Sequence, residues 1–279
     1  MLKIIIRLQI DFALKCLRNF QNKKQKMSIK KQLEKIIPKS VINFYHNIKF
    51  KGDAVHCPIC GSHYREFVTF GLVRRHNARC LKCNSLERHR LLWLFLQKET
   101  DFFTSPQFDF LHCAPEKTFY QHFTTQKNMN YHSCDLFPEY YPHVKGIEKQ
   151  DITQLSYADE RFDVVLCSHV MEHIPEDAKA FSELFRVLKK GAYVIFQIPQ
   201  DTTLATTYED FSITDPKERE KHFGQDDHVR VYGMDFKNRA EKAGFDVLES
   251  DYRLAFSESD RFKYGLGRDE YIYLCKKTK

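Results

Sequence analysis

The residues with the clearest chemistry are four cysteines in two pairs. Cys57 and Cys60 are separated by two residues, and so are Cys80 and Cys83. Each CxxC pair lets two thiolates reach one ion from a tight turn, and two pairs complete a tetrahedral shell for Zn²⁺. A closed shell has no open position for catalysis, so we expect structural zinc. An iron site and four free thiols are the alternatives.

A second group of polar residues stands where predicted strands end. Asp135 lies at the end of the run 130–136, about twenty residues after the turn 113–116, which is the separation found for an acid that binds ribose hydroxyls. That turn reads Cys-Ala-Pro-Glu and contains no glycine. A dinucleotide needs glycines there, because backbone amides must approach its pyrophosphate. The turn therefore argues against a nicotinamide cofactor.

Histidines follow another strand-like run, "RFDVVLCS", residues 161–168. His169, Glu172 and His173 come directly after it, and a general base among them is one interpretation. The alternative is that these side chains cap a helix or pack in the core.

The segment "FGQDDHVRVYG", residues 223–233, gathers further polar side chains between two glycines. It contains Asp227, His228, Arg230 and Tyr232. We expect this loop above the carboxyl edge of the sheet, where open α/β sheets bind ligands. Substrate binding, with His228 taking part in the chemistry, is the preferred interpretation, and a structural lid is the alternative.

The order of predicted elements supplies the scaffold for these residues. A helix is expected at 85–99, with Asn84 or Ser85 as its N-cap. Another is expected at 175–190, where Lys189 and Lys190 form a basic last turn before Gly191. After Pro106, strands alternate with helices, which predicts an α/β fold with a doubly wound, mostly parallel sheet covered on both faces. The strands are expected at 108–113, 130–136, 161–168, 192–199, 246–252 and 270–277, and further helices at 117–126 and 234–245.

The middle of the chain resembles a known family. "FDVVLCSHVMEHI" followed by "AFSELFRVLKKGAYVIFQIP" is similar to the fourth strand, following helix and fifth strand of the class I S-adenosylmethionine-dependent methyltransferases. The resemblance covers roughly residues 107–275. The stretch "TYEDFSITDPKEREKHFGQDDHVRVYGMDF" further resembles a branch whose members often carry an N-terminal cysteine-rich segment. The resemblance implies a seven-stranded Rossmann-like sheet, S-adenosylmethionine as cofactor and transfer of its methyl group to an acceptor.

The resemblance also implies which positions hold the cofactor. They are His112, Ala114 and Glu116 at the first turn, Asp135 for the ribose, Asp151 and Ile152 beside the adenine, and Cys167 and Ser168 beside the methionine part. The first turn departs from the family pattern, since it lacks both the usual acid and the glycines. S-adenosylmethionine has no phosphate, so a turn without glycine is compatible with it. A base, for which His169, His173 and His228 are the candidates, is needed only when the acceptor carries a proton.

Charge is concentrated at one end of the chain. Residues 1–53 hold thirteen Lys/Arg and three Asp/Glu, a net +10 within a total of +7, so the remaining residues carry −3. This arm is predicted to be helical and basic. It would suit an anionic membrane surface or another polyanion. A solvated helix with a buried apolar stripe is the alternative.

Composition bounds the remaining interpretation. The chain has 279 residues, of which 42% are hydrophobic, enough for one large α/β domain with a smaller attachment. No apolar run approaches the roughly 20 residues of a membrane-spanning helix, and the N-terminus lacks a signal-peptide cleavage site. The cysteines outside the two pairs are scattered and demand no disulfide, which favours a reducing cytoplasm.

The sequence as a whole predicts three parts: a basic arm at 1–53, a zinc-ribbon-like module at 54–84 and a methyltransferase domain at 85–279. The predicted function is methyl transfer to an unidentified acceptor in the cytoplasm, with membrane association through the arm left open. One alternative is a non-catalytic, zinc-containing binding protein on the same scaffold. Another is an RNA methyltransferase, which the negative charge of the body disfavours.

Overall fold

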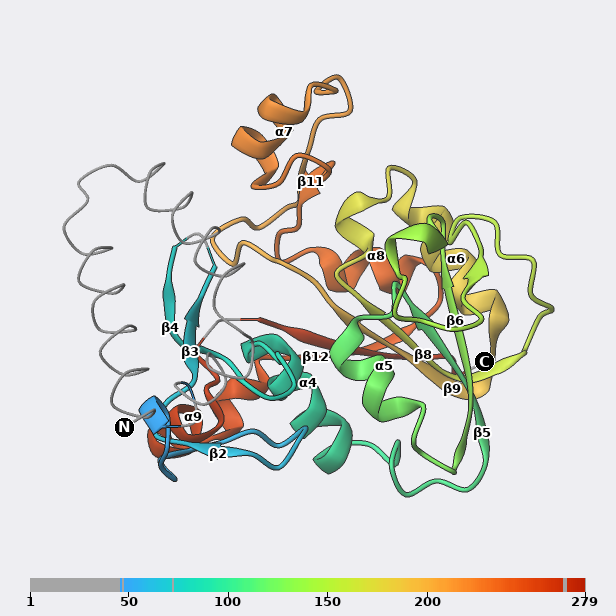
Figure 1. The fold of residues 1–279 in the computed structure, drawn as a ribbon. Coiled ribbons are helices and arrows are strands. Elements are labelled where there is room, and N and C mark those ends of the chain that lie inside the picture. The colour runs from blue at the N-terminus through green and yellow to red at the C-terminus, as the bar shows by residue number, and fades with distance from the viewer. Residues whose placement is uncertain (1–45, 47, 72, 268–269, 279) are drawn as a thin grey trace. The chain divides into compact units, whose positions relative to one another are not determined.

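The computed structural model describes residues 46, 48–71, 73–267 and 270–278 (Figure 1). The chain divides into two units, one of residues 1–55 and 63–67 and another of residues 56–62 and 68–279. Most of the predicted basic arm lies outside the described residues. In the first unit, the amide of Arg65 donates to the carbonyl of Phe50 at 2.9 Å. Apart from the short strands β1 (Val55–His56) and β2 (His63–Tyr64), the features below belong to the second unit.

A seven-stranded sheet forms the centre of the second unit (Figure 1). Its strands lie in the order β12-β13-β9-β8-β5-β6-β7, and only β13 runs antiparallel to its neighbours. The predicted mostly parallel sheet is therefore confirmed. The strands are β5 (Phe108–Cys113), β6 (Met129–Asp135), β7 (Glu148–Lys149), β8 (Phe162–Ser168), β9 (Leu188–Gln197), β12 (Asp246–Ser250) and β13 (Ile272–Lys276).

The order in which successive strands are added to the sheet reverses direction at β5. This strand pairs with β6 on one side and with β8 on the other, both in parallel. A crevice forms at such a switch point, because the connections that follow the two neighbouring strands diverge to opposite sides. The carboxyl ends of β5, β6 and β8 thus meet at one edge, where ligands bind in open α/β sheets.

Helices bury both faces of the sheet. Alternate residues of β5 point to opposite sides, so the Phe110 ring packs against Phe123 of α5 (Lys117–Phe123) while Leu111 joins the opposite core. Trp93 of α4 (Glu87–Lys98) stacks on Phe123 with ring centroids 5.8 Å apart. The opposite core is closed by α6 (Asp177–Val187) and α8 (Phe236–Lys242).

The remaining elements are short. Two α-helices that the sequence analysis did not predict, α7 (Pro216–Phe223) and α9 (Glu258–Tyr264), lie near the C-terminal side of the chain. Three short 3₁₀-helices are η1 (Pro138–Tyr140), η2 (Met171–His173) and η3 (Tyr252–Ala255). The small strands are β1 (Val55–His56), β2 (His63–Tyr64), β3 (Val68–Phe70), β4 (Arg75–Arg79), β10 (Tyr208–Glu209) and β11 (Arg230–Val231).

Two predicted helix ends are wrong. Helix α6 stops at Val187, and Lys189 and Lys190 belong to β9 rather than to a basic last turn. The Lys189 ammonium binds Asp163 at 2.7 Å, and this ion pair holds it against β8. Helix α4 has Leu86 as its N-cap in place of Asn84 or Ser85.

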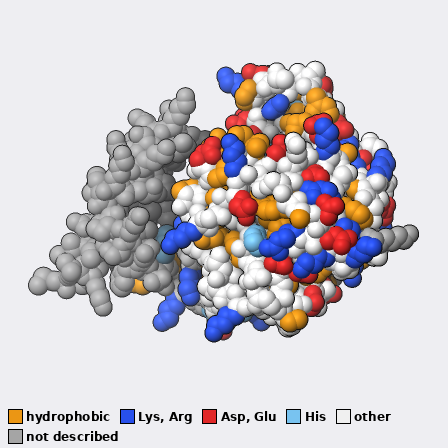
Figure 2. Space-filling view, turned by 90° about the vertical axis from the view of Figure 1, so that its right-hand side faces the viewer, with side chains coloured by type: hydrophobic (Ala, Val, Ile, Leu, Met, Phe, Trp, Pro, Cys, Tyr) orange, Lys and Arg blue, Asp and Glu red, His pale blue; other side chains and the backbone are white. Residues whose placement is uncertain are grey.

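None of the helices among the described residues has both the length and the apolar character needed to span a membrane. On the face shown in Figure 2, basic and acidic side chains are interspersed among polar and apolar ones.

Candidate functional site

A cavity of about 500 Å³ opens at the carboxyl edge of the sheet. This volume falls in the usual range for small-molecule sites, about 300–1,000 Å³. The lining comes from the last residues of β5 and β6, from the segments after β5, β6, β7 and β8, and from one residue before β11. It consists of Cys113, Ala114, Cys134, Asp135, Leu136, Phe137, Tyr140, Tyr141, Gln150, Asp151, Ile152, His169, Val170, His173, Ile174 and Asp227.

Two carboxylates of the lining are held by turns of their own backbone. Asp135 Oδ1 accepts a hydrogen bond from the Phe137 amide at 2.7 Å. Asp151 Oδ1 accepts one from the Thr153 amide at 2.8 Å. Such turns fix a short side chain relative to its backbone. Together with Ile152, also in the lining, these residues stand where the sequence analysis expects the ribose and adenine.

The two chain turns nearest the switch point have unusual backbones. Ala114 follows β5 with φ of 49°, and His169 follows β8 with φ of 54°. Both lie in the left-handed region, which a residue with a side chain adopts at an energetic cost. Ala114 thus takes the conformation that a glycine would take, and its amide donates to the Cys134 carbonyl at 2.9 Å.

Four of the predicted cofactor residues do not line this cavity. Cys167 lies in the core, completely buried. His112 is also completely buried, and its Nδ1 lies 3.0 Å from the Tyr131 hydroxyl. Burial lowers the pKa of His112 to about 3, so the ring is neutral. Glu116 and Ser168 belong to a neighbouring polar cluster.

Glu116 is held by helix α4. Its Oε1 receives hydrogen bonds from Arg88 at 2.6 Å and from His89 Nε2 at 2.7 Å, while Ser168 Oγ lies 3.5 Å from Oε2. Burial alone would raise the pKa of Glu116, but His89 and Arg88 keep it well below its usual value. Sequence reasoning missed Arg88 and His89, because "ERHR" is equally typical of a solvated helix face.

His169 bridges two buried carboxylates at the cavity wall. Its Nε2 lies 2.6 Å from Glu270 Oε1, and its Nδ1 lies 3.3 Å from Glu172 Oε1. Burial would lower the pKa of His169, but Glu270 and Glu172 outweigh burial and raise it to about 9. His169 therefore lies in the expected place, but its ring nitrogens are already engaged by carboxylates.

The structure brings His173 and His228 together from distant segments. Their rings meet edge to face, with centroids 4.7 Å apart. His173 lines the cavity, and its Nδ1 lies 3.4 Å from Asp227 Oδ2. His228 is buried behind it and does not itself line the cavity.

Arg230 and Tyr232 do not face the cavity, although the sequence analysis places them in a substrate-binding loop. Both are buried, and the Arg230 guanidinium donates to the carbonyls of Ile174 and Pro175 at 2.7 and 2.9 Å. They therefore brace the segment after β8.

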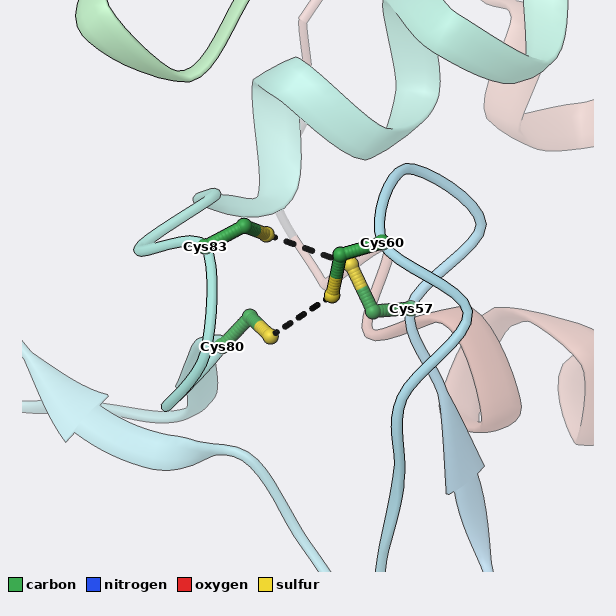
Figure 3. A group of neighbouring side chains, drawn as sticks. All are labelled: Cys57, Cys60, Cys80 and Cys83. Carbon is green, nitrogen blue, oxygen red and sulfur yellow. Dashed lines mark hydrogen bonds between the residues drawn. The ribbon is translucent and has the colours of Figure 1, made fainter. Parts of the chain in front are cut away.

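The four paired cysteines converge from two loops (Figure 3). The sulfurs of Cys57 and Cys83 are 3.6 Å apart, and those of Cys60 and Cys80 are 3.7 Å apart. Four sulfurs about 2.3 Å from one zinc ion in a tetrahedron lie roughly 3.8 Å from one another. The spacing of the cysteines therefore suits Zn²⁺.

The two cysteine loops have the same backbone hydrogen bonds. The Cys57 amide donates to the Ser62 carbonyl and the Cys80 amide to the Ser85 carbonyl, each at 2.9 Å. The fourth residue after each leading cysteine turns with positive φ, 67° at Gly61 and 61° at Asn84. Asn84 is thus the counterpart of Gly61, which is why it does not cap α4.

Comparisons with known proteins agree with this architecture. Residues 118–196 match the family described as a methyltransferase domain. No curated protein sequence matches the chain.

Solved structures offer only distant likenesses. An S-adenosylmethionine-dependent methyltransferase from Archaeoglobus fulgidus is 16% identical, with a TM-score of 0.46 over 70% of this chain and 96% of that one. One from Mesorhizobium loti is 12% identical, with a TM-score of 0.48 over 66% and 96%. Phosphoethanolamine N-methyltransferase 2 from Haemonchus contortus is 15% identical, with a TM-score of 0.43 over 68% and 53%.

The family match includes α5, β6, β8, α6 and most of β9. β6 and β8 are the two strands beside β5 at the switch point, and β9 is the next strand beyond β8. Its description agrees with the resemblance drawn from the sequence, and the seven-stranded sheet is the one that this resemblance implies. Residues 118–196 are thus similar to the methyltransferase-domain family, and the sheet that contains them has the order expected of a Rossmann-like methyltransferase fold.

Proposed function

We propose that the cavity at the carboxyl ends of β5, β6 and β8 binds S-adenosylmethionine and delivers its methyl group to an acceptor that enters beside His173 and Asp227. The observation that carries this proposal is the position of Asp135. Its carboxylate ends β6, lines the cavity and is oriented by its own turn. A carboxylate in this position accepts hydrogen bonds from ribose hydroxyls.

The charge of the lining supports a cationic ligand. Asp135, Asp151 and Asp227 all face the cavity. S-adenosylmethionine carries a sulfonium and an ammonium group, and carboxylates nearby favour such charges. Ile152 and Val170 supply apolar surface between the carboxylates.

The first turn is compatible with this ligand. Ala114 lines the cavity in the left-handed conformation, so the backbone turns away as it would at a glycine while the side chain adds one methyl group. Methyl transfer is a displacement in line with the breaking bond, and positioning supplies much of its acceleration. A cavity lined by residues from four neighbouring strand ends is suited to that task.

We propose further that Cys57, Cys60, Cys80 and Cys83 hold one structural zinc ion, supported by the matching loops and the sulfur spacing. Four thiolates leave no position for substrate. Thiolates persist in reducing compartments, so a cytoplasmic location suits this site.

The test is calorimetry with S-adenosylmethionine and its demethylated product. The wild-type chain is expected to bind both, and Asp135→Ala is expected to weaken binding by roughly ten- to a hundredfold. A hydrogen bond to a charged acceptor contributes about 1.5–3 kcal/mol, and about 1.4 kcal/mol corresponds to one decade.

Asp210→Ala is the matched control. Asp210 accepts from the amide two residues ahead, Ser212, as Asp135 does from Phe137, but it lies outside the cavity lining. Its replacement removes the same kind of turn and is expected to leave affinity unchanged. A folded wild-type chain that binds neither ligand at millimolar concentration would overturn the proposal.

A further inference from the structure

Glu172 is a buried carboxylate that the methyl-transfer proposal does not use. The residue is 1% exposed, and neither of its carboxylate oxygens has a hydrogen bond. Its nearest partner is His169, whose Nδ1 forms an ion pair with Oε1 at 3.3 Å without the geometry of a hydrogen bond. A buried charge is costly unless it is paired or coordinates a metal ion.

His228 presents a second unpartnered atom at the same place. Its Nδ1 lies 3.2 Å from the Phe223 carbonyl. A carbonyl only accepts, so Nδ1 carries the proton and Nε2 of the neutral ring has a free lone pair. That Nε2 is buried and has no hydrogen-bond partner. A histidine that donates from one nitrogen to a backbone carbonyl and offers the other is the usual arrangement of a metal ligand.

His173 completes the group. One ligand atom each from Glu172, His173 and His228 can be chosen so that all lie within 4.8 Å of one another. Metal–ligand distances of about 2.0–2.2 Å place two ligands at most about 4.4 Å apart. Small side-chain rotations therefore bring the three atoms onto one ion.

The two segments that carry these residues are fixed to each other. The Val229 amide donates to the Glu172 carbonyl at 3.0 Å. Arg230 Nη1 binds the Ile174 carbonyl at 2.7 Å, and Tyr232 donates to the Met171 carbonyl at 3.2 Å. The backbones that carry the ligands are thus held together before any ion arrives, and only the side chains need to rotate.

The charge of the surroundings also favours a cation. Five charged groups face Glu172 or its neighbours: Glu270, Glu116, Arg88, His169 and, beside His173, Asp227. Arg88 balances Glu116. Even when His169 is counted as a cation, Glu172 and Glu270 together leave one negative charge uncompensated.

We propose that Glu172, His173 and His228 bind a divalent transition-metal ion at the wall of the cofactor cavity. Two imidazoles and one carboxylate favour Mn²⁺, Fe²⁺, Co²⁺ or Zn²⁺ over Ca²⁺, and three protein ligands leave positions open. His173 also lines the cavity, so an open position there would face the acceptor.

This placement extends the proposed function, on which its chemical role rests, to acceptors with a hydroxyl group. A metal ion lowers the pKa of a hydroxyl group whose oxygen it binds. The acceptor O–H bond breaks and the proton leaves to water at the open side of the cavity. The oxygen lone pair forms a bond to the methyl carbon, and the C–S bond breaks with its electron pair retained by sulfur.

The experiment uses the full chain with its cysteine site loaded with zinc, and Mn²⁺ as the probe, because thiolates do not prefer Mn²⁺. Free Mn²⁺ is followed by electron paramagnetic resonance. Wild type is expected to bind about one Mn²⁺, as one three-ligand group is present. Glu172→Gln and His228→Ala are expected to weaken that binding at least tenfold.

Matched controls come from the neighbouring exposed residues. Asp226→Asn and His222→Ala change an exposed acid and an exposed histidine near the group, and both are expected to bind Mn²⁺ like wild type. Circular dichroism checks that each variant folds. If a ligand variant does not fold, wild type alone decides: failure to bind Mn²⁺, Fe²⁺ or Co²⁺ at millimolar concentration overturns the site. Wild-type affinity in folded His228→Ala would overturn it as well.

Two further readings separate the metal site from the methyltransferase proposal. Bound Mn²⁺ is expected to enhance water-proton relaxation through an exchangeable water ligand, and no enhancement would overturn the acceptor role. S-adenosylmethionine binding is measured on the same samples. Mn²⁺ binding without cofactor binding contradicts the proposed function alone, and the reverse contradicts the metal site alone.

Discussion

At the scale of single residues, His112 shows how burial separates a polar side chain from the site it resembles. It stands one residue before Cys113, which lines the cavity, yet its ring points to the opposite face of the sheet. There it stacks near Phe110 and packs edge to face against Phe123. Strand alternation, which reverses at each residue, accounts for the difference.

His112 should make stability depend on pH. Its pKa is about 3 in the folded chain and about 6.5 when unfolded, so the unfolded state binds more protons between these values. The contribution is fully present above pH 6.5 and is lost as pH falls toward 3. Urea unfolding of wild type and His112→Gln is expected to show their stability difference shifting by about 2 kcal/mol against wild type from pH 7 to pH 5. Parallel pH profiles would contradict this assignment.

Among the cofactor residues predicted from the sequence, Ala114, Asp135, Asp151 and Ile152 line the cavity, whereas His112, Glu116, Cys167 and Ser168 do not. At the end of β8 the residue that lines the cavity is His169, one position beyond Ser168. The difference arises from the left-handed turn at His169, a conformation that no sequence rule assigns to histidine with certainty. Glu172 and His228 lie near each other because segments more than fifty residues apart come into contact. The periodicity of a sequence reveals local elements and cannot predict such a contact.

At the scale of elements, the cysteine loops and helix α4 form one construction. The second loop ends at Ser85, and α4 begins at Glu87. Thr118 of α5 donates to the Cys83 carbonyl at 3.1 Å, so the loop is also attached to the helix that follows the first turn of the cavity. The cysteine loops are therefore part of the support for Arg88 and His89, which hold Glu116.

Cys80→Ser is expected to lose most of the bound zinc and to lower the melting temperature, since three thiolates would share an open shell. Elemental analysis and thermal denaturation measure these effects. Cys275→Ser is the control, because Cys275 is buried in the sheet core, away from the cluster. That variant is expected to keep about one zinc per chain. Wild-type zinc content in Cys80→Ser would refute the four-thiolate site.

Element prediction failed where local signals were short. Helix α7 has an N-cap at Asp215, proline at its first position and Gly224 at its end, and all three are recognisable helix signals. Its residues are almost all polar, however, so no apolar residues recur at helical spacing. The end of α6 could not be read, because Lys189 is drawn into β9 by Asp163 of the neighbouring strand. Strand β5, in contrast, is buried at every position except Asp109 and was predicted with its observed bounds.

At the scale of the whole molecule, charge is the feature that separates the arm from the rest. Deleting residues 1–27 is expected to weaken binding to phosphatidylserine-containing vesicles while leaving S-adenosylmethionine affinity unchanged. The reason is the excess of basic residues interleaved with Leu, Ile and Phe. Vesicle sedimentation measures this effect, with neutral vesicles as the control. Equal vesicle binding by the full-length and shortened chains would contradict the membrane prediction and favour the alternative, a solvated helix with a buried apolar stripe.

The architecture of the second unit was predictable because alternating strands and helices permit few arrangements. The antiparallel β13 between β9 and β12 was not, since it depends on how the chain returns after α8. The position of the last strands is thus a property of the complete sheet rather than of any local pattern.

The hydrogen bonds of Arg90 link parts of the chain that are synthesised at very different times. Its buried guanidinium donates to the carbonyls of Ala78 and Ser85 in the cysteine module and to those of Tyr264 and Gly265, which come 174 and 175 residues later. A nascent chain must keep this cation hydrated until α9 has left the ribosome. Folding of the cysteine module into its final environment therefore waits until residues 264 and 265 have been synthesised, and chains released before them would expose that interior to chaperones and proteases.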